Sequence, residues 1–174
     1  MLREIGCESV DVRRAEQLDD VDALIIPGGE STTIGKLADL YGITERIRER
    51  VAEGMPVWGT CAGAIFLARG VPGRPQPLLG LMDITVERNA FGRQVDSFET
   101  HLYIPRLGEP PFHAVFIRAP RIAEAGPGVE VLARLGDGAI VAAREGRLLA
   151  TAFHPELTHD TRFHRYFCEL IPRG

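Results

Sequence analysis

The sequence predicts an α/β fold, in which helices flank a mixed β-sheet. In residues 23–69, short apolar runs alternate with helical patterns, and this spacing is typical of parallel βαβ units. In residues 82–153, strand-like runs follow one another without helices, which indicates antiparallel hairpins added to that sheet. The chain has 174 residues, of which 45% are hydrophobic and 25% charged. This length and composition are typical of one globular domain.

Three strands and three helices are expected in the first half of the chain. The strands are predicted from apolar runs bounded by glycine or proline. The helices are predicted from apolar residues three or four positions apart, and Ser31, Thr32 and Thr33 are all suitable caps for the first helix. The expected strands are residues 9–12, 23–26 and 56–59, and the expected helices are residues 31–41, 44–53 and 62–69.

Six strands and one helix are expected in the second half. Residues 72–77 are rich in proline and glycine and are expected to form a loop. The turn residues Gly136, Asp137 and Gly138 predict a hairpin between two of the strands. The expected strands are residues 82–87, 98–104, 114–117, 129–135, 139–144 and 148–153, and the expected helix is residues 160–171.

The chain opens on a pattern that usually stands later in such a domain. Residues 1–5 resemble the last turn of a helix, and Gly6 follows them as a typical helix stop. An α/β domain that opens in the middle of a helix leads us to expect that a further segment normally precedes it.

Composition excludes several classes of function. The chain has 20 basic and 24 acidic residues, a net charge of −4, which argues against a nucleic-acid binder that works through a basic face. Apolar runs stay below 18 residues and no secretory signal is recognisable, so we expect neither a membrane span nor export. The three cysteines fit a reducing cytoplasm. Without a Cys-x-x-Cys pair, we expect no metal site, and we expect no cofactor.

The strongest sign of chemistry is the pentapeptide Gly59-Thr60-Cys61-Ala62-Gly63, which follows a strand-like run. It has the nucleophile-elbow pattern G-x-S-x-G with cysteine in place of serine. The flanking glycines let a strand and a helix pass closely, and the helix N-terminus favours a thiolate. The alternative is an ordinary buried cysteine beside glycines required only for packing.

A base for this nucleophile is expected in the segment 153–156, of sequence FHPE. Residues two apart in an extended segment point to the same side, so His154 and Glu156 can meet. His154 would then move the proton and Glu156 would hold the ring. The alternative is a histidine at a strand end beside an exposed glutamate. His101, His113, His159 and His164 lack such a neighbour and are expected at the surface or at a sheet edge.

The segment 27–33 exposes backbone N–H groups between a strand and a helix. The segment does not match the Walker pattern of phosphate-binding loops, because Gly35-Lys36 is followed by leucine rather than serine or threonine. An oxyanion hole, formed by the N–H groups of Gly29 and Ala62, is compatible with the pattern. A simple tight turn is the remaining alternative.

Five segments together resemble a known family. They are residues 27–33 (PGGESTT), 58–64 (WGTCAGA), 87–99 (ERNAFGRQVDSFE), 116–120 (FIRAP) and 153–158 (FHPELT). The set is similar to the class I glutamine amidotransferases, and the segment 87–99 is particular to the glutaminase subunits of pyridoxal 5′-phosphate synthase. The resemblance implies a flavodoxin-like class I glutamine amidotransferase fold in one domain, residues 1–174, with the first βα unit missing at the N-terminus.

The resemblance also implies roles for individual residues. Cys61 is the expected nucleophile, His154 the base and Glu156 its partner. The planar guanidinium group of arginine matches the carboxylate of glutamine, which suits Arg88 and Arg118 to this task. The alternative for both residues is a surface ion pair. The residues expected to bind glutamine are Gly29, Glu30, Ser31, Arg88, Ile117 and Arg118.

The implied activity is hydrolysis of L-glutamine to glutamate and ammonia through a cysteine thioester. The implied partner is the synthase subunit, which receives the ammonia in a hetero-oligomer and makes pyridoxal 5′-phosphate (vitamin B6). Two alternatives remain open at this point: a γ-glutamyl peptidase or hydrolase that acts alone, and an inactive scaffold that only binds the synthase.

Overall fold

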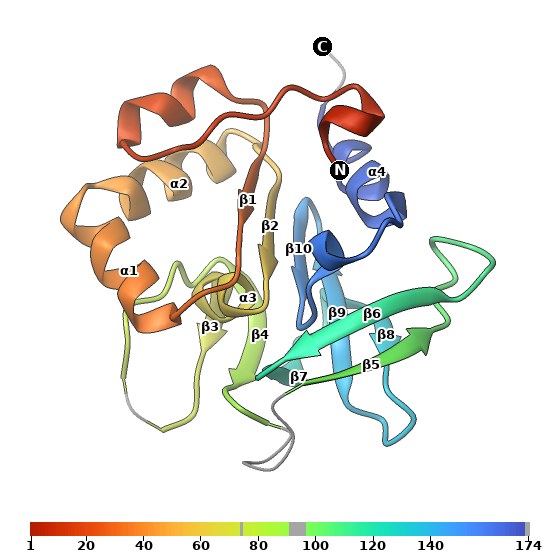
Figure 1. Cartoon of the computed structure of the whole chain (residues 1–174). Helices are drawn as coiled ribbons and strands as arrows, with labels where there is room; N and C mark the ends of the chain where they lie inside the picture. The colour runs from red at the N-terminus through yellow and green to blue at the C-terminus, as the bar shows by residue number, and fades with distance from the viewer. Residues whose placement is uncertain (74, 91–96, 173–174) are drawn as a thin grey trace.

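A mixed β-sheet with helices on both faces forms the body of the molecule in the computed structural model, which describes residues 1–73, 75–90 and 97–172 (Figure 1). The strands of this sheet are β1 (Leu24–Ile26), β2 (Val57–Thr60), β3 (Ala68–Gly70), β4 (Met82–Glu87), β7 (Arg121–Ala125), β8 (Glu130–Arg134), β9 (Ile140–Glu145) and β10 (Leu148–Thr151). Their order is β1-β2-β10-β9-β7-β4-β3, and β8 pairs with β9.

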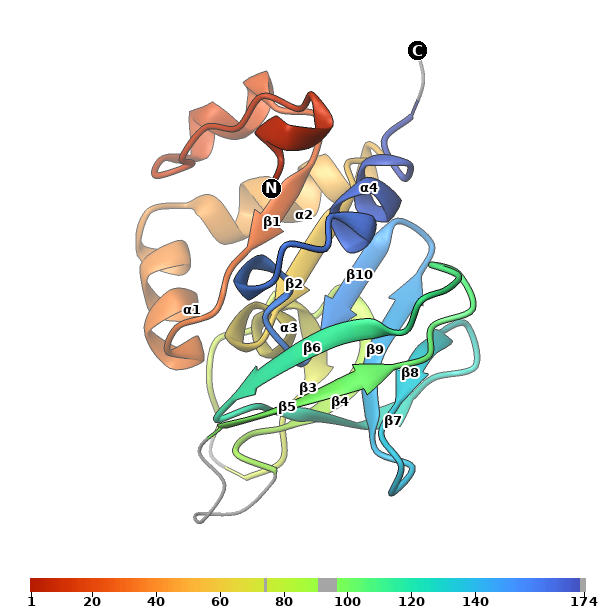
Figure 2. The same cartoon turned by 45° about the vertical axis from the view of Figure 1, so that its right-hand side comes forward.

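The sheet has a parallel part and an antiparallel part, as the sequence predicts. β2 runs parallel to β1 and β10, while β9 runs antiparallel to β10, β7 and β8. A separate antiparallel pair, β5 (Ser97–Leu102) and β6 (Phe112–Ile117), crosses in front of β9 and β10 (Figure 2).

Helices cover the sheet from two sides. α1 and α2 lie on one side of β1 and β2, and α4 lies on the other side (Figures 1 and 2). The α-helices are α1 (Ser31–Leu40), α2 (Ile43–Ala52), α3 (Ala62–Leu67) and α4 (Arg162–Cys168), and the 3₁₀ helices are η1 (Arg3–Ile5), η2 (Ala15–Asp20) and η3 (Pro155–Leu157). None of the helices in the described residues combines the length and the apolar character needed to cross a membrane.

Strand β2 separates two apolar cores because neighbouring side chains of a strand point to opposite faces. Val57 packs into the core beneath α1, α2 and α3, whereas Trp58 packs into the core beneath α4 and the β5–β6 pair. The Trp58 ring lies 6.0 Å from that of Phe163 and 5.5 Å from that of Phe167, both on α4. The strand that leads to Cys61 is therefore held firmly from both sides.

Several predicted elements differ from the structure. Residues 9–12 form no strand, and the helix expected at 62–69 ends at Leu67 because β3 begins at Ala68. Strand β7 was not predicted. The last helix is shorter than predicted, Arg162–Cys168 rather than 160–171. The other predicted elements are confirmed with shifts of one or two residues at their ends, including η1, which ends at Gly6 as expected.

Three parallel strands end at the same edge of the sheet and deliver the candidate site residues there. β1 leads into Pro27 and Gly28, β2 leads into Cys61, and β10 leads within three residues to His154. Ligands of open α/β sheets bind outside the carboxyl ends of the strands, so this edge is where a site is expected.

Candidate active site

Cys61 occupies a strained turn between β2 and α3. Its backbone has φ 50° and ψ −109°, in a region that residues other than glycine rarely adopt. The Cys61 N–H donates to the carbonyl of Thr151 at 2.8 Å, and its carbonyl accepts from the N–H of Ala64 at 3.1 Å. Strain of this kind persists only where neighbouring structure holds it, and these bonds tie the turn to β10 and α3.

The glycines on either side of Cys61 are required by close backbone contacts. A Cβ atom on Gly63 would collide with the carbonyl group of Ile26 in β1, and one on Gly59 would collide with the carbonyl group of Gly63. The sequence argument that these glycines let the strand and helix pass closely is confirmed. The close packing of β2 against α3 and the tight turn at Cys61 therefore require the same two glycines.

The side chains of His154 and Glu156 are in direct contact. His154 Nδ1 lies 2.7 Å from Glu156 Oε1. Glu156 stands in η3 rather than in an extended segment, so a 3₁₀ turn brings the two together. The His154 side chain is 14% exposed and that of Glu156 is 43% exposed. The His154 N–H donates to the carbonyl of Val115 in β6 at 2.9 Å and fixes the start of this turn.

His154 also interacts with the side chain of Cys61. That interaction, followed by the hydrogen bond with Glu156, outweighs burial and raises the pKa of His154 to about 10. Glu156 is affected in the opposite sense: burial favours its neutral form, but the His154 hydrogen bond and charge leave the pKa of Glu156 below its usual value. Because Nδ1 is engaged by Glu156, Nε2 is the ring nitrogen available to Cys61.

Gly28 adjoins both Cys61 and His154. A Cβ atom on Gly28 would lie 2.7 Å from His154 Cε1 and 3.5 Å from Cys61 Cβ. This distance to the imidazole is shorter than a Cβ atom normally allows, so the absence of a side chain leaves room for the ring. The segment 27–33 thus shapes the site on the side of His154 as well as at the start of α1.

Glu30 caps helix α1, in place of the serine or threonine caps that the sequence predicts. Its carboxylate accepts from the N–H of Thr32 at 3.1 Å, from the N–H of Thr33 at 2.7 Å and from the Thr33 hydroxyl at 2.8 Å. The hydroxyl of Thr33, followed by the two N–H groups, lowers the pKa of Glu30 to about 2. Glu30 therefore presents a fixed negative charge at the N-terminus of α1.

Arg88 lies against this negative charge. Its Nη2 donates to Glu30 Oε1 at 3.0 Å, and its Nη1 donates to Gln76 Oε1 at 3.1 Å and to Thr32 Oγ1 at 3.3 Å. Ser31 Oγ donates to the same oxygen of Gln76 at 3.2 Å. The structure therefore brings Glu30, Ser31 and Arg88, all expected to bind glutamine, into one hydrogen-bonded group.

Gln76 belongs to this group, although sequence reasoning missed it. It lies in the proline-rich loop, where the only sequence signal was the absence of regular structure. Its Nε2 atom is buried and has no hydrogen-bond partner within the described part of the chain. Because the Thr32 hydroxyl also donates to Gln76 Oε1, at 3.4 Å, this oxygen accepts from three donors, while Nε2 remains an unused donor.

The remaining candidates lie near Cys61 and at the start of α1. The carbonyl oxygen of Ile117 is 3.9 Å from Cys61 Sγ, and Arg118 follows with a positive φ of 43°. Ala62 is the first residue of α3, where the N–H has no partner within the helix. Gly29 has φ 150° and directly precedes the cap of α1. Residues 91–96 of the motif 87–99 lie outside the described residues.

One histidine prediction is wrong. His164 is not at the surface: it is buried in α4, with its ring against that of Trp58 at 5.1 Å between centroids. Burial lowers the pKa of His164, which favours the neutral ring. His101 and His159 are exposed, and His113 pairs with Glu99 at 2.6 Å on β5. Within the described residues, no cluster of three or more histidine, cysteine or acidic side chains could hold a metal ion.

Comparisons with known proteins agree on one family. The model of the SNO glutamine amidotransferase family matches residues 1–172. The chain is 64% identical to the pyridoxal 5′-phosphate synthase subunit PdxT of Herpetosiphon aurantiacus, covering 98% of this chain and 91% of the relative. It is also 64% identical to the protein of the same name from Pelotomaculum thermopropionicum, covering 100% of this chain and 88% of the relative.

Solved structures match the fold. One described as a glutamine amidotransferase is 57% identical, with a TM-score of 0.93 over 98% of this chain and 89% of that chain. A putative GMP synthase component from Thermoplasma acidophilum is only 19% identical, with a TM-score of 0.68 over 98% of this chain and 84% of that chain. The second likeness concerns the fold alone.

Proposed function

Because the chain belongs to the SNO glutamine amidotransferase family, we propose that it is the glutaminase subunit of a pyridoxal 5′-phosphate synthase. It hydrolyses L-glutamine to L-glutamate and ammonia and delivers the ammonia to a synthase subunit for vitamin B6 biosynthesis. Relatives between 56% and 64% identical, and matched over nearly the whole chain, carry the name of that subunit. We further propose that residues 1–174 form one glutaminase domain, which works in the cytoplasm.

The observation that carries the catalytic proposal is the series of contacts from Cys61 through His154 to Glu156. Cys61 sits in a strained turn at the N-terminus of α3, its side chain interacts with His154 beside Gly28, and Glu156 Oε1 lies 2.7 Å from His154 Nδ1. A nucleophile, a base and a group that orients the base are the three parts of a catalytic triad. We assign these roles to Cys61, His154 and Glu156 in that order.

The acylation step follows from this arrangement. Cys61 Sγ, as the thiolate, attacks the side-chain carbonyl carbon of glutamine, and the carbonyl oxygen takes up the negative charge. The N–H groups of Gly29 and Ala62 hold that oxygen. His154, whose pKa is raised to about 10, is protonated at neutral pH and donates its proton to the leaving nitrogen. Ammonia departs and a γ-glutamyl thioester remains on Cys61.

The deacylation step reverses these roles. His154, now neutral, takes a proton from water, and the resulting hydroxide attacks the thioester carbon. The bond to Cys61 breaks, glutamate leaves, and His154 is again protonated for the next cycle. No cofactor enters either step.

Glutamine recognition is assigned to the charged group beside α1. The fixed negative charge of Glu30 suits the α-ammonium group, and the guanidinium of Arg88 suits the α-carboxylate. We assign Gly29, Ser31, Ile117 and Arg118 to the same glutamine site.

Ammonia released into bulk water becomes protonated and loses its nucleophilicity. Direct transfer to the synthase prevents this loss, so the two proteins work as a hetero-oligomer. The isolated glutaminase is therefore expected to be weakly active compared with the complex.

The test compares Cys61→Ala with wild type and with the control variant Cys7→Ala, each assayed for glutamate release with and without the synthase subunit. Cys61→Ala is expected to lose at least 10³-fold in kcat, roughly the effect of removing a nucleophile, while Cys7→Ala retains activity. If Cys61→Ala still hydrolyses glutamine, Cys61 is not the nucleophile. Hydrolysis of γ-glutamyl peptides by the isolated chain, with no gain from the synthase, rules out the proposed activity.

A further inference from the structure

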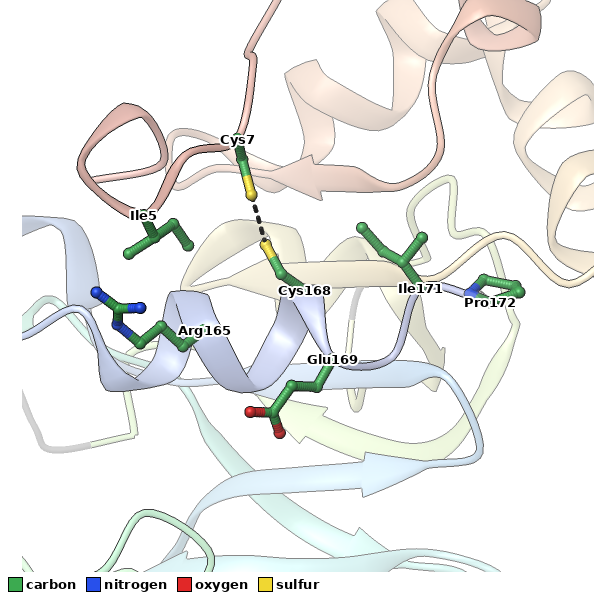
Figure 3. Close-up of a pocket in the computed structure, with 7 residues that line it drawn as sticks. All are labelled: Ile5, Cys7, Arg165, Cys168, Glu169, Ile171 and Pro172. Atoms are coloured by element: carbon green, nitrogen blue, oxygen red, sulfur yellow. Dashed lines mark hydrogen bonds between the residues drawn. The ribbon is translucent and has the colours of Figure 1, made fainter. Parts of the chain in front are cut away.

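Two cysteines lie together at the other end of the molecule from the sheet edge that carries Cys61 and His154. Cys7 follows η1 and Cys168 is the last residue of α4, and their side chains point toward each other (Figure 3). The Sγ atoms are 3.3 Å apart, although the residues are 161 positions apart in the sequence. Both residues are free thiols and are partly exposed. This contact plays no part in the proposed glutaminase reaction.

The two sulfur atoms border an open cavity. Its volume is about 420 Å³, which is ample for water or a molecule of similar size. The residues that line it are Ile5, Cys7, Arg165, Cys168, Glu169, Ile171 and Pro172 (Figure 3). A small neutral oxidant can therefore reach the sulfur atoms without unfolding of the chain.

The separation of the sulfur atoms is close to that required for a bond. A disulfide bond is about 2.05 Å long, so each sulfur has to move by well under 1 Å to reach the other. Side-chain rotation in a partly exposed cavity wall is sufficient for a movement of this size.

We propose that Cys7 and Cys168 form a redox-active dithiol, which a peroxide converts into an intramolecular disulfide that ties the N-terminal segment to α4. Cys7 sulfur takes one oxygen from hydrogen peroxide, breaking the O–O bond, and becomes a sulfenic acid while one water leaves. Cys168 sulfur then attacks Cys7 sulfur and displaces the hydroxyl group as a second water. Two thiols and one peroxide give one disulfide and two waters, and the thiols lose the two electrons that the peroxide gains.

The environments of the two thiols favour this order of events. Burial, followed by the hydrogen bond with Cys7, raises the pKa of Cys168 to about 12. Cys168 therefore stays protonated at neutral pH and is a poor first target, since the thiolate is the form that reacts with peroxide. Once Cys7 is oxidised, Cys168 is already in place as the resolving thiol.

The disulfide is expected to stabilise the fold. It closes a loop that spans most of the chain and so restricts the unfolded state strongly. It also fixes the end of α4, whose Phe163 and Phe167 pack on Trp58 of β2. A rise in Tm on the order of 10 °C is expected on oxidation.

The experiment treats the full-length protein with one to ten equivalents of hydrogen peroxide, blocks the remaining thiols, and digests it with trypsin without reduction. Cleavage after arginine places Cys7 in the peptide 4–13, Cys168 in the peptide 166–173 and Cys61 in the peptide 51–69. The expected product is a disulfide-linked pair of the peptides 4–13 and 166–173 in a monomeric protein, reversible by dithiothreitol. Thermal unfolding before and after oxidation gives the shift in Tm.

Variants separate the proposed pair from general oxidation. Cys7→Ser and Cys168→Ser should each abolish the linked peptide and the rise in Tm, while Cys61→Ser should retain both. If Cys168→Ser fails to fold, Cys7→Ser carries the test by itself, because Cys7 lies outside the regular elements. Sulfinic or sulfonic acid at Cys7 or Cys168 without a linked peptide overturns the proposal, and so does a link that involves Cys61 or a second molecule. The experiment does not measure glutaminase activity. If the disulfide proposal fails, the proposed function is therefore unaffected.

Discussion

The two halves of the candidate site are held by different physical means. The nucleophile side, residues 57–67, is buried along its whole length, and Cys61 is only 8% exposed. The glutamine side is held by hydrogen bonds near the surface, where the side chain of Glu30 is 52% exposed and that of Arg88 is 41% exposed. Steric crowding fixes the Cys61 sulfur, whereas water competes for each hydrogen bond among the side chains of the proposed glutamine site. Substitutions should therefore cost stability on the first side and mainly substrate affinity on the second.

The largest effect is expected from Gly63→Ala on the nucleophile side. The new methyl group would collide with the backbone carbonyl of Ile26, which cannot move without separating β1 from β2. We expect a loss of about 3 kcal/mol or more in the free energy of unfolding, or no soluble protein. Urea denaturation measures this loss.

Gly136→Ala is the matched control for that substitution. Gly136 has nothing within 4 Å of its expected Cβ position and has no positive φ, so its free energy of unfolding should stay within about 0.5 kcal/mol of wild type. Equal losses in the two variants would contradict the claim that crowding holds the nucleophile turn.

Glu156→Gln should give the next largest effect, on activity and on its pH dependence. The Glu156 carboxylate stabilises the protonated ring of His154, so its removal lowers the pKa of His154 from about 10 toward the usual 6.5. Activity needs protonated His154 as the acid, and kcat/KM should therefore begin to fall at a lower pH than in wild type. We expect a loss of about 100-fold at pH 8, measured as glutamate release by the synthase complex between pH 6 and 10. An unchanged alkaline limb would show that Glu156 does not act through His154.

Gly28→Ala tests the boundary between the two halves. The added Cβ would press on His154 Cε1 at 2.7 Å, while Cys61 Cβ, at 3.5 Å, stays in ordinary contact. The ring has to shift by more than half an ångström to reach ordinary contact, and we expect kcat to fall about 10-fold, with little change in Tm. Steady-state kinetics and thermal unfolding check both points, again beside Gly136→Ala. A loss of folding instead of activity would place Gly28 among the packing glycines.

The sequence predicted the fold where local patterns and packing agree. Strand β4 is predicted with its exact bounds because apolar and polar residues alternate in it and one face is buried. Strand β7, of sequence RIAEA, carries one strongly apolar residue, Ile122, and exists because β4 and β9 pair with it on either side. Residues 9–12 have strand-like valines, but Val10 is 67% exposed and no strand pairs with this segment in the described residues. Pairing partners are not visible in a local pattern.

The same limit applies to the site. Cys61, His154 and Glu156 could be selected because their local motifs carry a chemical reason, and the resemblance to a family pointed to Glu30 and Arg88. Gln76 could not be selected, since its hydrogen bonds reach residues 45 positions before it and 12 positions after it. His164 was misplaced because its burial against Trp58 depends on how α4 crosses β2. Contacts between distant segments are the part that only the folded chain supplies.

The smallest effect is expected from Gln76→Ala, on the glutamine side. This substitution removes the oxygen that Ser31, Thr32 and Arg88 share, and Arg88 then keeps its bonds to Glu30 and Thr32. Because water replaces part of what is lost at this partly buried position, we expect KM for glutamine to rise about five-fold to ten-fold. The value of kcat should stay within about two-fold, since an interaction made equally in the ground state and the transition state changes KM alone.

Gln76→Glu, which keeps an acceptor oxygen for Arg88, should recover most of the affinity. A fall in kcat with unchanged KM would instead mean that Gln76 acts on the nucleophile side, and the division between the two halves would fail at this residue.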